Sequence, residues 1–472
     1  MSMFSIVAEN GESTVVTEYF PSERKSESYQ SEAELEAEFI RLLCEQGYEY
    51  LKIHTESQLI ENLRRQIEKL NGISFSATEW ARFYGLYLSN MNEGIEEKTL
   101  TIQRDSVKTL ARDDGSTKNV RLIDKKNIHN NFLQVINQYQ DNEGSKKSRY
   151  DVTILVNGLP LVHVELKRRG VSIRNAFDQI ERYQRESFWK SSGLFEFVQI
   201  FIISNGTNTK YYSNTTRFQA EKEHNSSSKK KGKQTSNSFE FTSFWADGKN
   251  KIIPDLVDFT KTFLAKHTIL NVLTKYCVFT SENMLLVMLP YQITATERIL
   301  NRIEISTNYK KFGTTDAGGY IWHTTGSGKT LTSFKTAVLA SKLDYIDKVL
   351  FVVDRKDLDY QTMKEYDRFQ KDAANSNTSN ITSQNTTQNG NSGKIGDSTE
   401  NGAGNQSSAE PADNSNNQAE NTQATQENTQ TQQDNTKDEN YISPELKDFL
   451  ESYEALIDEY CEFLEHYNSS DV

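Results

Sequence analysis

The pattern of apolar and polar positions changes several times along the chain, and its clearest feature is a pair of alternating stretches in the first half. Residues 151–156 and 161–167 alternate as β-strands do, and Asn157-Gly158 lies between them. Asn-Gly supplies the positive φ angles that a tight hairpin needs. Side chains alternate between the two faces of a strand. We therefore predict one face with Val162, Val164 and Leu166 and an opposite face with His163, Glu165 and Lys167.

Further elements are predicted around this hairpin. Residues 31–46 carry apolar side chains at helical spacing, and a second helix is predicted at 174–185. Strands predicted at 199–204, 210–213 and 238–244 would complete a sheet. Together these elements indicate a first α/β domain over residues 1–260.

The pattern changes again in the second half of the chain. An apolar run at 284–289, a helix at 293–305 and two buried strands at 319–322 and 349–354 predict a second α/β domain over residues 270–370. Residues 371–440 are rich in Asn, Thr, Gln and Ser, so we expect disorder there, because so few apolar groups cannot offset the entropy of ordering. Residues 441–472 predict an acidic amphipathic helix that packs on the body or on a partner.

The alternating hairpin also carries candidate chemistry. If Asp151 lies beside Glu165, two carboxylates can hold Mg²⁺, and Lys167 can orient the attacking water and offset phosphate charge. The alternative is an amphipathic hairpin whose charged residues face solvent. Glu36 or Glu38 on the first helix could assist this site, although a solvated acidic face is the favoured interpretation.

This arrangement resembles the Asp…Glu-x-Lys core of the PD-(D/E)xK nuclease superfamily, with Tyr150 where that name has proline. Gln179 and Tyr183 are four residues apart and therefore share one face of the predicted helix. A Gln-x-x-x-Tyr helix after the Glu-x-Lys strand is similar to the RecB-like branch of these nucleases. The resemblance implies that both residues position the catalytic groups.

A second motif predicts nucleotide binding. Residues 323–330 read His-Thr-Thr-Gly-Ser-Gly-Lys-Thr, with His323 at the position where the usual phosphate loop has glycine. Backbone N–H groups of such a loop surround phosphate oxygens, Lys329 would reach the β- and γ-phosphates, and Thr330 would hold Mg²⁺. The predicted ATP-binding residues of the loop are Thr325, Gly326, Ser327, Gly328, Lys329 and Thr330.

The order of these motifs resembles the restriction (R, HsdR) subunit of a type I restriction–modification system. Three segments carry that resemblance: Gly319 to Thr330, Val353 to Asp359, and Ile253 to Phe259. It implies an endonuclease fused to a superfamily 2 translocase, which cuts DNA away from its recognition site after ATP-driven pulling of the DNA. For this chain we expect an α/β fold with a PD-(D/E)xK nuclease domain followed by an incomplete RecA-like domain. The resemblance also implies double-stranded DNA and the methyltransferase (M) and specificity (S) subunits as partners. By the same resemblance, Gln292 reads the adenine edge; a surface polar role is the alternative.

Charge and composition bear on DNA binding and on where in the cell the protein is expected. The net charge of −12 argues against DNA binding, but residues 371–472 carry −15, which leaves +3 on the rest of the chain. A basic stretch at 221–236 indicates a solvated loop that could contact DNA. There is no apolar run of about 20 residues and no signal-peptide pattern, and the three cysteines are scattered, so a cytoplasmic protein without membrane contact is expected.

The sequence leaves the origin of the chain open. No Asp-Glu-x-His box and no second RecA-like domain follow the phosphate loop, so a truncated or frameshifted R subunit and a fragment of a longer product are both compatible. We accordingly expect weak ATP binding and negligible hydrolysis by this chain. Two other functions remain as alternatives: a non-catalytic remnant that binds DNA or partners, and a stand-alone RecB-like repair nuclease.

Overall fold

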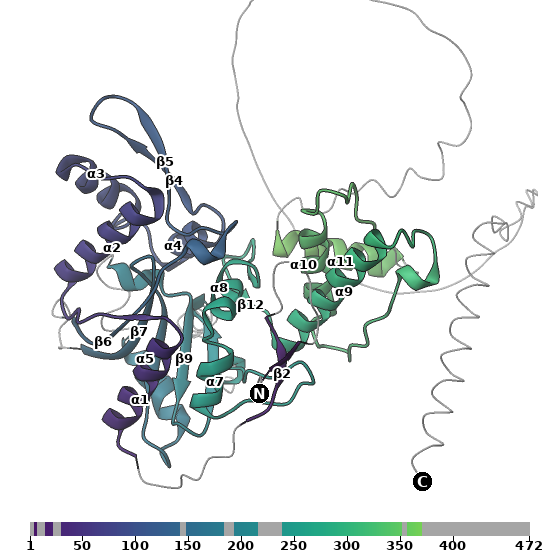
Figure 1. Cartoon of the computed structure of the whole chain (residues 1–472), viewed down its shortest axis with the longest axis horizontal. Helices are drawn as coiled ribbons and strands as arrows, with labels where there is room; N and C mark the ends of the chain where they lie inside the picture. The colour runs from purple at the N-terminus through teal and green to yellow at the C-terminus, as the bar shows by residue number, and fades with distance from the viewer. Residues whose placement is uncertain are drawn as a thin grey trace, which may run out of the picture. The chain divides into compact units, whose positions relative to one another are not determined.

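The fold is built around one mixed β-sheet, seen in the computed structural model of the chain (Figure 1). The structure describes residues 4–6, 15–21, 30–141, 148–183, 193–215, 238–351 and 356–370. The disorder expected at 371–440, the helix expected at 441–472 and the basic stretch at 221–236 lie outside these residues.

Six strands form the central sheet, in the order β10-β9-β8-β7-β6-β3. The β3–β6 and β8–β9 pairs are parallel and the other neighbouring pairs are antiparallel. All eight residues of β8 and all five of β9 are buried, as expected for strands covered on both faces. The strands are β3 (Glu49–Tyr50), β6 (Leu133–Asp141), β7 (Ser148–Val156), β8 (Leu159–Leu166), β9 (Ile200–Ser204) and β10 (Thr209–Ser213).

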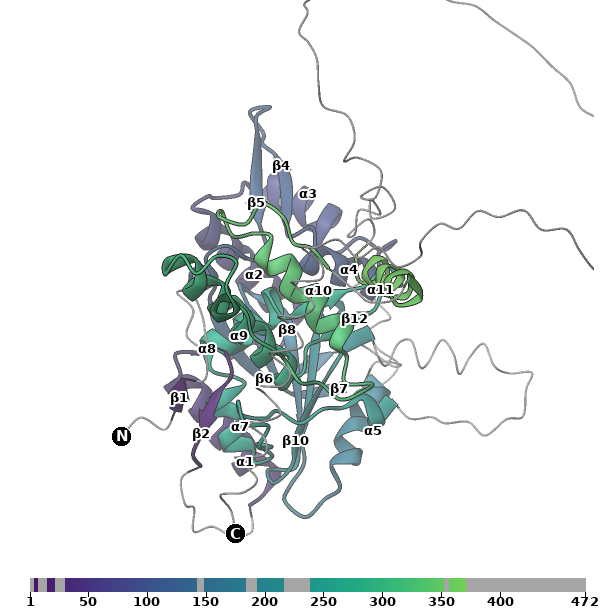
Figure 2. The same cartoon turned by 90° about the vertical axis from the view of Figure 1, so that its right-hand side faces the viewer.

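Helices cover both faces of this sheet. Neighbouring residues of β10 point to opposite faces: the Tyr211 ring stacks on Phe263, which follows α7, and the Tyr212 ring packs on Phe177 of α5. Figure 2 shows α5 and α7 on the two sides of the strands. The helices of this part are α1 (Glu32–Glu45), α2 (Glu56–Asn71), α3 (Ala77–Tyr87), α4 (Ile95–Gln103), α5 (Ile173–Tyr183), α7 (Leu256–Thr262) and α8 (Lys266–Thr274).

Smaller elements complete the described residues. Three two-stranded sheets pair β1 (Phe4–Ile6) with β2 (Thr17–Tyr19), β4 (Val107–Ala111) with β5 (Thr117–Arg121), and β11 (Cys277–Phe279) with β12 (Leu285–Val287). The short helical turns are η1 (Ile128–Asn130), η3 (Leu194–Phe197), η4 (Ser238–Phe241) and η5 (Thr315–Ala317). Three longer helices follow β12, namely α9 (Pro290–Asn308), α10 (Lys329–Ala340) and α11 (Lys356–Phe369).

Several predicted elements are confirmed. The helix expected at 31–46 is α1, which begins with a capping box between Ser31 and Glu34. The helices expected at 174–185 and 293–305 are α5 and α9. The strands expected at 199–204 and 210–213 are β9 and β10.

Three predicted strands are wrong. Residues 238–241 form the turn η4, and only a single bridge joins Ser243 to Tyr211, so 238–244 adds no strand to the sheet. Residues 319–322 and the described residues 349–351 have no strand structure, and Trp322 and Leu350 are each 81% exposed. A buried parallel strand needs hydrogen-bonded neighbours and helices on both faces. No strand within the described residues pairs with these apolar segments.

Candidate active site

The β7–β8 hairpin places the candidate catalytic residues. Its turn is as predicted, since Asn157 and Gly158 have φ angles of 54° and 84°. A Cβ atom on Gly158 would lie 2.6 Å from Leu63 Cα, so the turn also packs closely against α2. The register pairs Val152 with Val164, and this places Asp151 next to Glu165 on the neighbouring strand.

Asp151, Glu165 and Lys167 come together as the strand pattern predicts. The Asp151 Oδ2 atom accepts a hydrogen bond from the Leu166 backbone N–H at 3.0 Å. The Lys167 Nζ atom donates to Glu165 Oε1 at 2.9 Å and to the Leu166 carbonyl oxygen at 2.9 Å. The Glu165 side chain is completely buried, so the alternative of a solvent-facing charged hairpin is wrong.

Burial raises the pKa of both carboxyl groups, Asp151 and Glu165. Burial, and then the Glu165 charge, raise the pKa of Asp151 to about 7. Burial also raises the pKa of Glu165 to about 7, although Lys167 opposes the shift. The pKa of His163, on the same face as Glu165, falls to about 4 because the ring is buried, so the ring is neutral at pH 7. Near neutral pH the two carboxyls therefore hold about one proton between them.

The donor set fits a hard divalent cation. The Glu165 Oε2 atom is buried and has no hydrogen-bond partner in the described part of the chain, and the His163 Nε2 atom lies 3.7 Å from it. No group of three His, Cys, Asp or Glu side chains suited to a metal occurs within the described ranges. Mg²⁺ commonly uses one or two carboxylates and takes its remaining oxygen ligands from water and substrate phosphate. Two carboxylates, one with a free oxygen, therefore match the requirements of Mg²⁺.

Gln179 and Tyr183 lie on one face of α5, as predicted, and contact each other. The Gln179 Nε2 atom donates to the Tyr183 hydroxyl oxygen, and the Tyr183 hydroxyl donates to the Arg149 carbonyl oxygen of β7 at 2.8 Å. The Tyr183 ring also packs edge-to-face on Tyr150, the residue before Asp151. These contacts hold α5 against β7, the strand that carries Asp151, and so fit the expected role of Gln179 and Tyr183 in positioning that residue.

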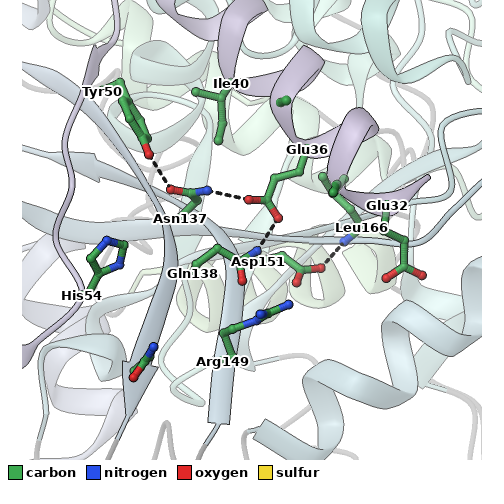
Figure 3. Close-up of a pocket in the computed structure, with 13 residues that line it drawn as sticks. Glu32, Glu36, Ile40, Tyr50, His54, Asn137, Gln138, Arg149, Asp151 and Leu166 are labelled. Carbon is green, nitrogen blue, oxygen red and sulfur yellow. Dashed lines mark hydrogen bonds between the residues drawn. The ribbon is translucent and has the colours of Figure 1, made fainter. Parts of the chain in front are cut away.

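Glu36 differs from expectation. It does not belong to a solvated acidic face but lines a cavity of about 650 Å³ together with Asp151, Arg149 and Gln138 (Figure 3). The Asn137 and Gln138 side-chain amides donate to its two carboxylate oxygens. Burial raises the pKa of Glu36, and the Asp151 charge adds to the shift. Glu36 thus adds a carboxylate near Asp151 in this cavity.

The sequence contained only part of the signal for this cavity. Glu32 and Glu36 are one helical turn apart and both line it, which a helix-face argument could have found. Gln138 was missed for another reason. It has a φ of 52° within β6, and that left-handed conformation of a non-glycine residue has no mark in the sequence.

The predicted phosphate loop precedes α10. Gly326 and Gly328 have φ angles of 80° and 76°, which glycine adopts without strain, and Gly328 is the N-cap of α10. Thr325 and Lys329 are exposed, and Thr330 lies in the first turn of α10. The Ser327 hydroxyl lies 3.3 Å from His323 Nδ1, so the histidine at the unusual first position contacts the loop.

Gln292 lies against this loop, and its amide is engaged by the protein. Its Nε2 atom donates to the Ser327 carbonyl oxygen at 3.1 Å, and its Oε1 atom accepts from the Leu289 N–H at 2.9 Å. The Tyr291 hydroxyl donates to the same Ser327 carbonyl at 2.9 Å. Gln292 is buried, so the surface polar alternative is wrong, and the predicted adenine contact stays a prediction.

Fold and site together define a class of proteins in which a sheet domain with a carboxylate–lysine site precedes a nucleotide-loop region of helicase type. Comparison with known families agrees with this order. Residues 29–220 match the family described as type I restriction enzyme R protein N terminus. Residues 285–453 match the family described as type III restriction enzyme, res subunit.

Similarity to individual proteins shows which family the chain belongs to. The chain is 47% identical over 301 residues to the type I restriction enzyme EcoprrI endonuclease subunit of Escherichia coli, an alignment that covers 64% of this chain and 91% of that one. It is 39% identical to the SsaAORF53P endonuclease subunit of Staphylococcus saprophyticus (75% and 35% covered) and to the SauMSSORF170P endonuclease subunit of Staphylococcus aureus strain MSSA476 (76% and 35%). The chain belongs to the family of type I restriction enzyme endonuclease (R) subunits.

These matches confirm the resemblance and the mixed α/β fold class drawn from the motifs. The chain spans about a third of the length of the staphylococcal relatives, at 35%. The domain boundaries at 1–260 and 270–370 stay predictions. No helix in the described ranges is both long and apolar enough to span a bilayer.

Proposed function

We propose that this chain hydrolyses phosphodiester bonds of double-stranded DNA with Mg²⁺ bound at Asp151 and Glu165. One observation carries the proposal: a fully buried carboxylate, Glu165, keeps an oxygen without a hydrogen-bond partner among the described residues, beside a second carboxyl and a lysine. Burying such a group is costly unless something compensates for it. A cation at this position would offset that cost.

Each residue of the site would have a separate role in the hydrolysis. Asp151 and Glu165 would hold the cation through carboxylate oxygens. Bound Mg²⁺ would polarise the scissile phosphate and lower the pKa of a neighbouring water. Lys167 has three donors, of which two point to Glu165 Oε1 and the Leu166 carbonyl, and the third would reach a phosphate oxygen. Gln179 and Tyr183 would hold α5 in place against β7.

The nucleotide part of the proposal rests on the loop geometry. Thr325 to Thr330 would surround the phosphates of ATP, with Lys329 at the β- and γ-phosphates and Thr330 at Mg²⁺. Tyr291 and Gln292 both donate to the Ser327 carbonyl, so they would hold the loop in place through a backbone oxygen that phosphate does not need. As part of a restriction enzyme, the chain would act with methyltransferase and specificity subunits, which supply the base recognition that no motif here provides.

The test is cleavage of supercoiled plasmid over a range of Mg²⁺ concentrations, by the chain alone and with the M and S subunits of its own system. We expect Asp151→Asn to lower cleavage roughly 10²–10³-fold or more, the size of effect that removal of one preorganised polar group has in other active sites. Asp178→Asn is the matched control, because Asp178 is exposed on α5. Calorimetric titration with Mg²⁺ supplies a readout independent of activity. Wild-type cleavage by Asp151→Asn would reject the proposal.

A further inference from the structure

His163 lies on β8 two residues before Glu165, and the proposed reaction assigns it no role. The side chain is fully buried. Three aromatic rings pack edge-to-face on the imidazole, with ring centroids 5.8, 6.3 and 6.2 Å away: Tyr150, Tyr183 and Phe201. A polar ring is costly to bury among such neighbours unless its nitrogens find polar contacts. The contacts of the two nitrogens therefore indicate what a histidine does here.

Thr153 contacts the first of these nitrogens. The β7–β8 register places Thr153 directly opposite His163, and the Thr153 Oγ1 atom lies 3.2 Å from His163 Nδ1. Thr153 is buried too, and its hydroxyl makes no other hydrogen bond within the described ranges. A buried hydroxyl hydrogen needs an acceptor, and Nδ1 is the one within reach. The Thr153 hydroxyl therefore donates to Nδ1, which leaves the hydrogen of the neutral ring on Nε2.

The second nitrogen faces the carboxylate of the candidate site. The His163 Nε2 atom lies 3.7 Å from Glu165 Oε2, the oxygen that has no hydrogen-bond partner among the described residues. An N–H···O hydrogen bond is about 2.7–3.2 Å long, so a movement of roughly 0.5 Å by the carboxylate would complete one. Nε2 carries a hydrogen in the neutral ring held by Thr153 and in the charged ring alike. The contact therefore does not depend on the protonation state of the imidazole.

The two contacts form a chain from Thr153 through His163 to Glu165. A carboxylate oxygen has two lone pairs, so Glu165 Oε2 can accept a hydrogen bond from Nε2 and still coordinate a cation. Hydrogen bonds of this kind orient the carboxylates that ligate metals, and their loss typically lowers metal affinity about 10–100-fold. The packed rings around His163 restrict its side chain, so the imidazole can hold the carboxylate in one orientation.

We propose that Thr153 and His163 are positioning residues of this site: the Thr153 hydroxyl keeps the ring hydrogen of His163 on Nε2, and that N–H orients the Glu165 oxygen that would bind Mg²⁺. The inference rests on the proposed function in that it takes Glu165 as an Mg²⁺ ligand. It adds two residues that belong neither to the Asp…Glu-x-Lys pattern nor to the Gln-x-x-x-Tyr helix.

The first test is calorimetric titration of the 472-residue chain with Mg²⁺ in the absence of DNA, so that the readout does not depend on cleavage. Thr153→Val removes the hydroxyl and keeps a similar shape, whereas Thr153→Ser keeps the hydroxyl. We expect Thr153→Val to weaken Mg²⁺ binding about tenfold and Thr153→Ser to stay within about threefold of wild type. Thr209→Val is the matched control, because Thr209 is also buried on a strand and its hydroxyl lies 2.8 Å from Ser204 Oγ. Wild-type affinity of Thr153→Val would overturn the proposal.

The second test changes His163 itself. His163→Gln keeps an N–H donor near the position of Nε2, and His163→Leu has none. We expect His163→Leu to lower Mg²⁺ affinity about 10–100-fold and His163→Gln about fivefold or less. Nitrogen NMR of the chain labelled at histidine, with the signals assigned through His163→Gln, reports which ring nitrogen carries the hydrogen. A hydrogen on Nδ1 alone, or equal affinities of His163→Leu and wild type, would overturn the proposal.

The double change Thr153→Val/His163→Leu separates positioning from a merely structural role. It replaces both partners of a buried hydrogen bond by apolar groups, which is nearly neutral for stability, so we expect thermal unfolding without added metal close to that of wild type. Its Mg²⁺ affinity should be no lower than that of His163→Leu, because Thr153 acts only through His163. Losses that add would show that Thr153 acts by another route and would overturn the chain of contacts.

These outcomes are distinguishable from failure of the nuclease proposal. Mg²⁺ binding that weakens in Asp151→Asn but not in His163→Leu rejects the positioning role and leaves the nuclease proposal standing. Mg²⁺ binding that weakens in Asp151→Asn, His163→Leu and Thr153→Val, in a chain that never cuts DNA, supports the positioning role and rejects the nuclease. No Mg²⁺ binding by the wild type rejects both.

Discussion

Asp151 and Glu165 differ from most acids of the chain because water hardly reaches them. Burial raises the pKa of each carboxyl to about 7, and the Glu165 charge adds to the shift of Asp151. The Leu166 N–H opposes the shift of Asp151 and Lys167 opposes both, but only in part. A cation that binds between them must therefore displace a proton near neutral pH. The same two side chains on an exposed hairpin would be ionised throughout this range, so burial is what makes the site sensitive to pH.

The first prediction concerns this proton. As pH falls from 8 to 6, the pair takes up a proton, so the Mg²⁺ concentration for half-maximal cleavage should rise by up to about tenfold per unit below pH 7. Cleavage rates over a grid of pH and Mg²⁺ measure this shift, and Asp178→Asn should follow the wild-type curve. A half-saturating concentration that is constant across the range would show that the pair is not the cation site.

At the scale of elements, the hairpin β7–β8 is held by its turn as much as by its strands. Gly158 has a φ of 84°, and a Cβ there would lie 2.6 Å from Leu63 Cα of α2. Gly115, in the turn between β4 and β5, has the same φ of 84° but nothing within 4 Å of its Cβ position. A comparison of the two glycines therefore separates the effect of the backbone conformation on stability from the effect of close packing.

The second prediction compares Gly158→Ala with Gly115→Ala. Both changes place alanine in the left-handed region, which costs about 1 kcal/mol. Gly158→Ala must also move backbone of α2, so we expect it to lower the free energy of unfolding by roughly 2–4 kcal/mol. Urea denaturation of the two variants measures the difference. Equal decreases in the free energy of unfolding for the two variants would mean that the Leu63 backbone can move away from the new methyl group without loss of stability.

At the scale of the whole molecule, Glu297 joins distant parts of the chain. It lies on α9 and its Oε1 atom accepts from the Val15 N–H at 2.9 Å and from the Tyr276 hydroxyl at 3.0 Å. Its Oε2 atom is buried without a hydrogen-bond partner among the described residues. Burial raises the pKa of Glu297 to about 7. One acid therefore connects the N-terminal segment, the sheet domain and the helix beside the nucleotide loop.

The third prediction follows from the sign of that shift. The folded chain holds the Glu297 proton more tightly than the unfolded chain, whose glutamate titrates near 4.5, so the stabilising effect is complete below pH 4.5 and is lost as pH rises to about 7. Glu297→Gln removes the titration and keeps the acceptor. Relative to wild type, the variant should gain on the order of 3 kcal/mol between pH 4.5 and 8.

Denaturation of the two proteins at a series of pH values measures this difference, in which the effects of Asp151 and Glu165 cancel because both proteins contain them. Glu304→Gln, on the same helix, is the matched control and should stay parallel to wild type. A difference between Glu297→Gln and wild type that does not change with pH would contradict the assignment.

Local rules were enough for the parts of the fold that depend on near neighbours. Asn157-Gly158 specifies its turn, strand alternation places Glu165 and Lys167 on one face, and spacing of four places Gln179 beside Tyr183. The glycines of the nucleotide loop likewise adopt the left-handed angles that their motif requires. Each of these outcomes rests on backbone geometry within a few residues, which the sequence by itself determined.

Tertiary structure decided the rest, because burial and pairing depend on residues far apart in the chain. Glu36 faces the cavity only because α1 lies beside β6 and β7, and Gln138 meets it through an unusual backbone angle. The apolar residues 319–322 were expected to form a strand, but a strand exists only where another strand supplies hydrogen-bond partners. The raised pKa values of Asp151 and Glu165 likewise come from packing between distant elements, and no local pattern encodes them.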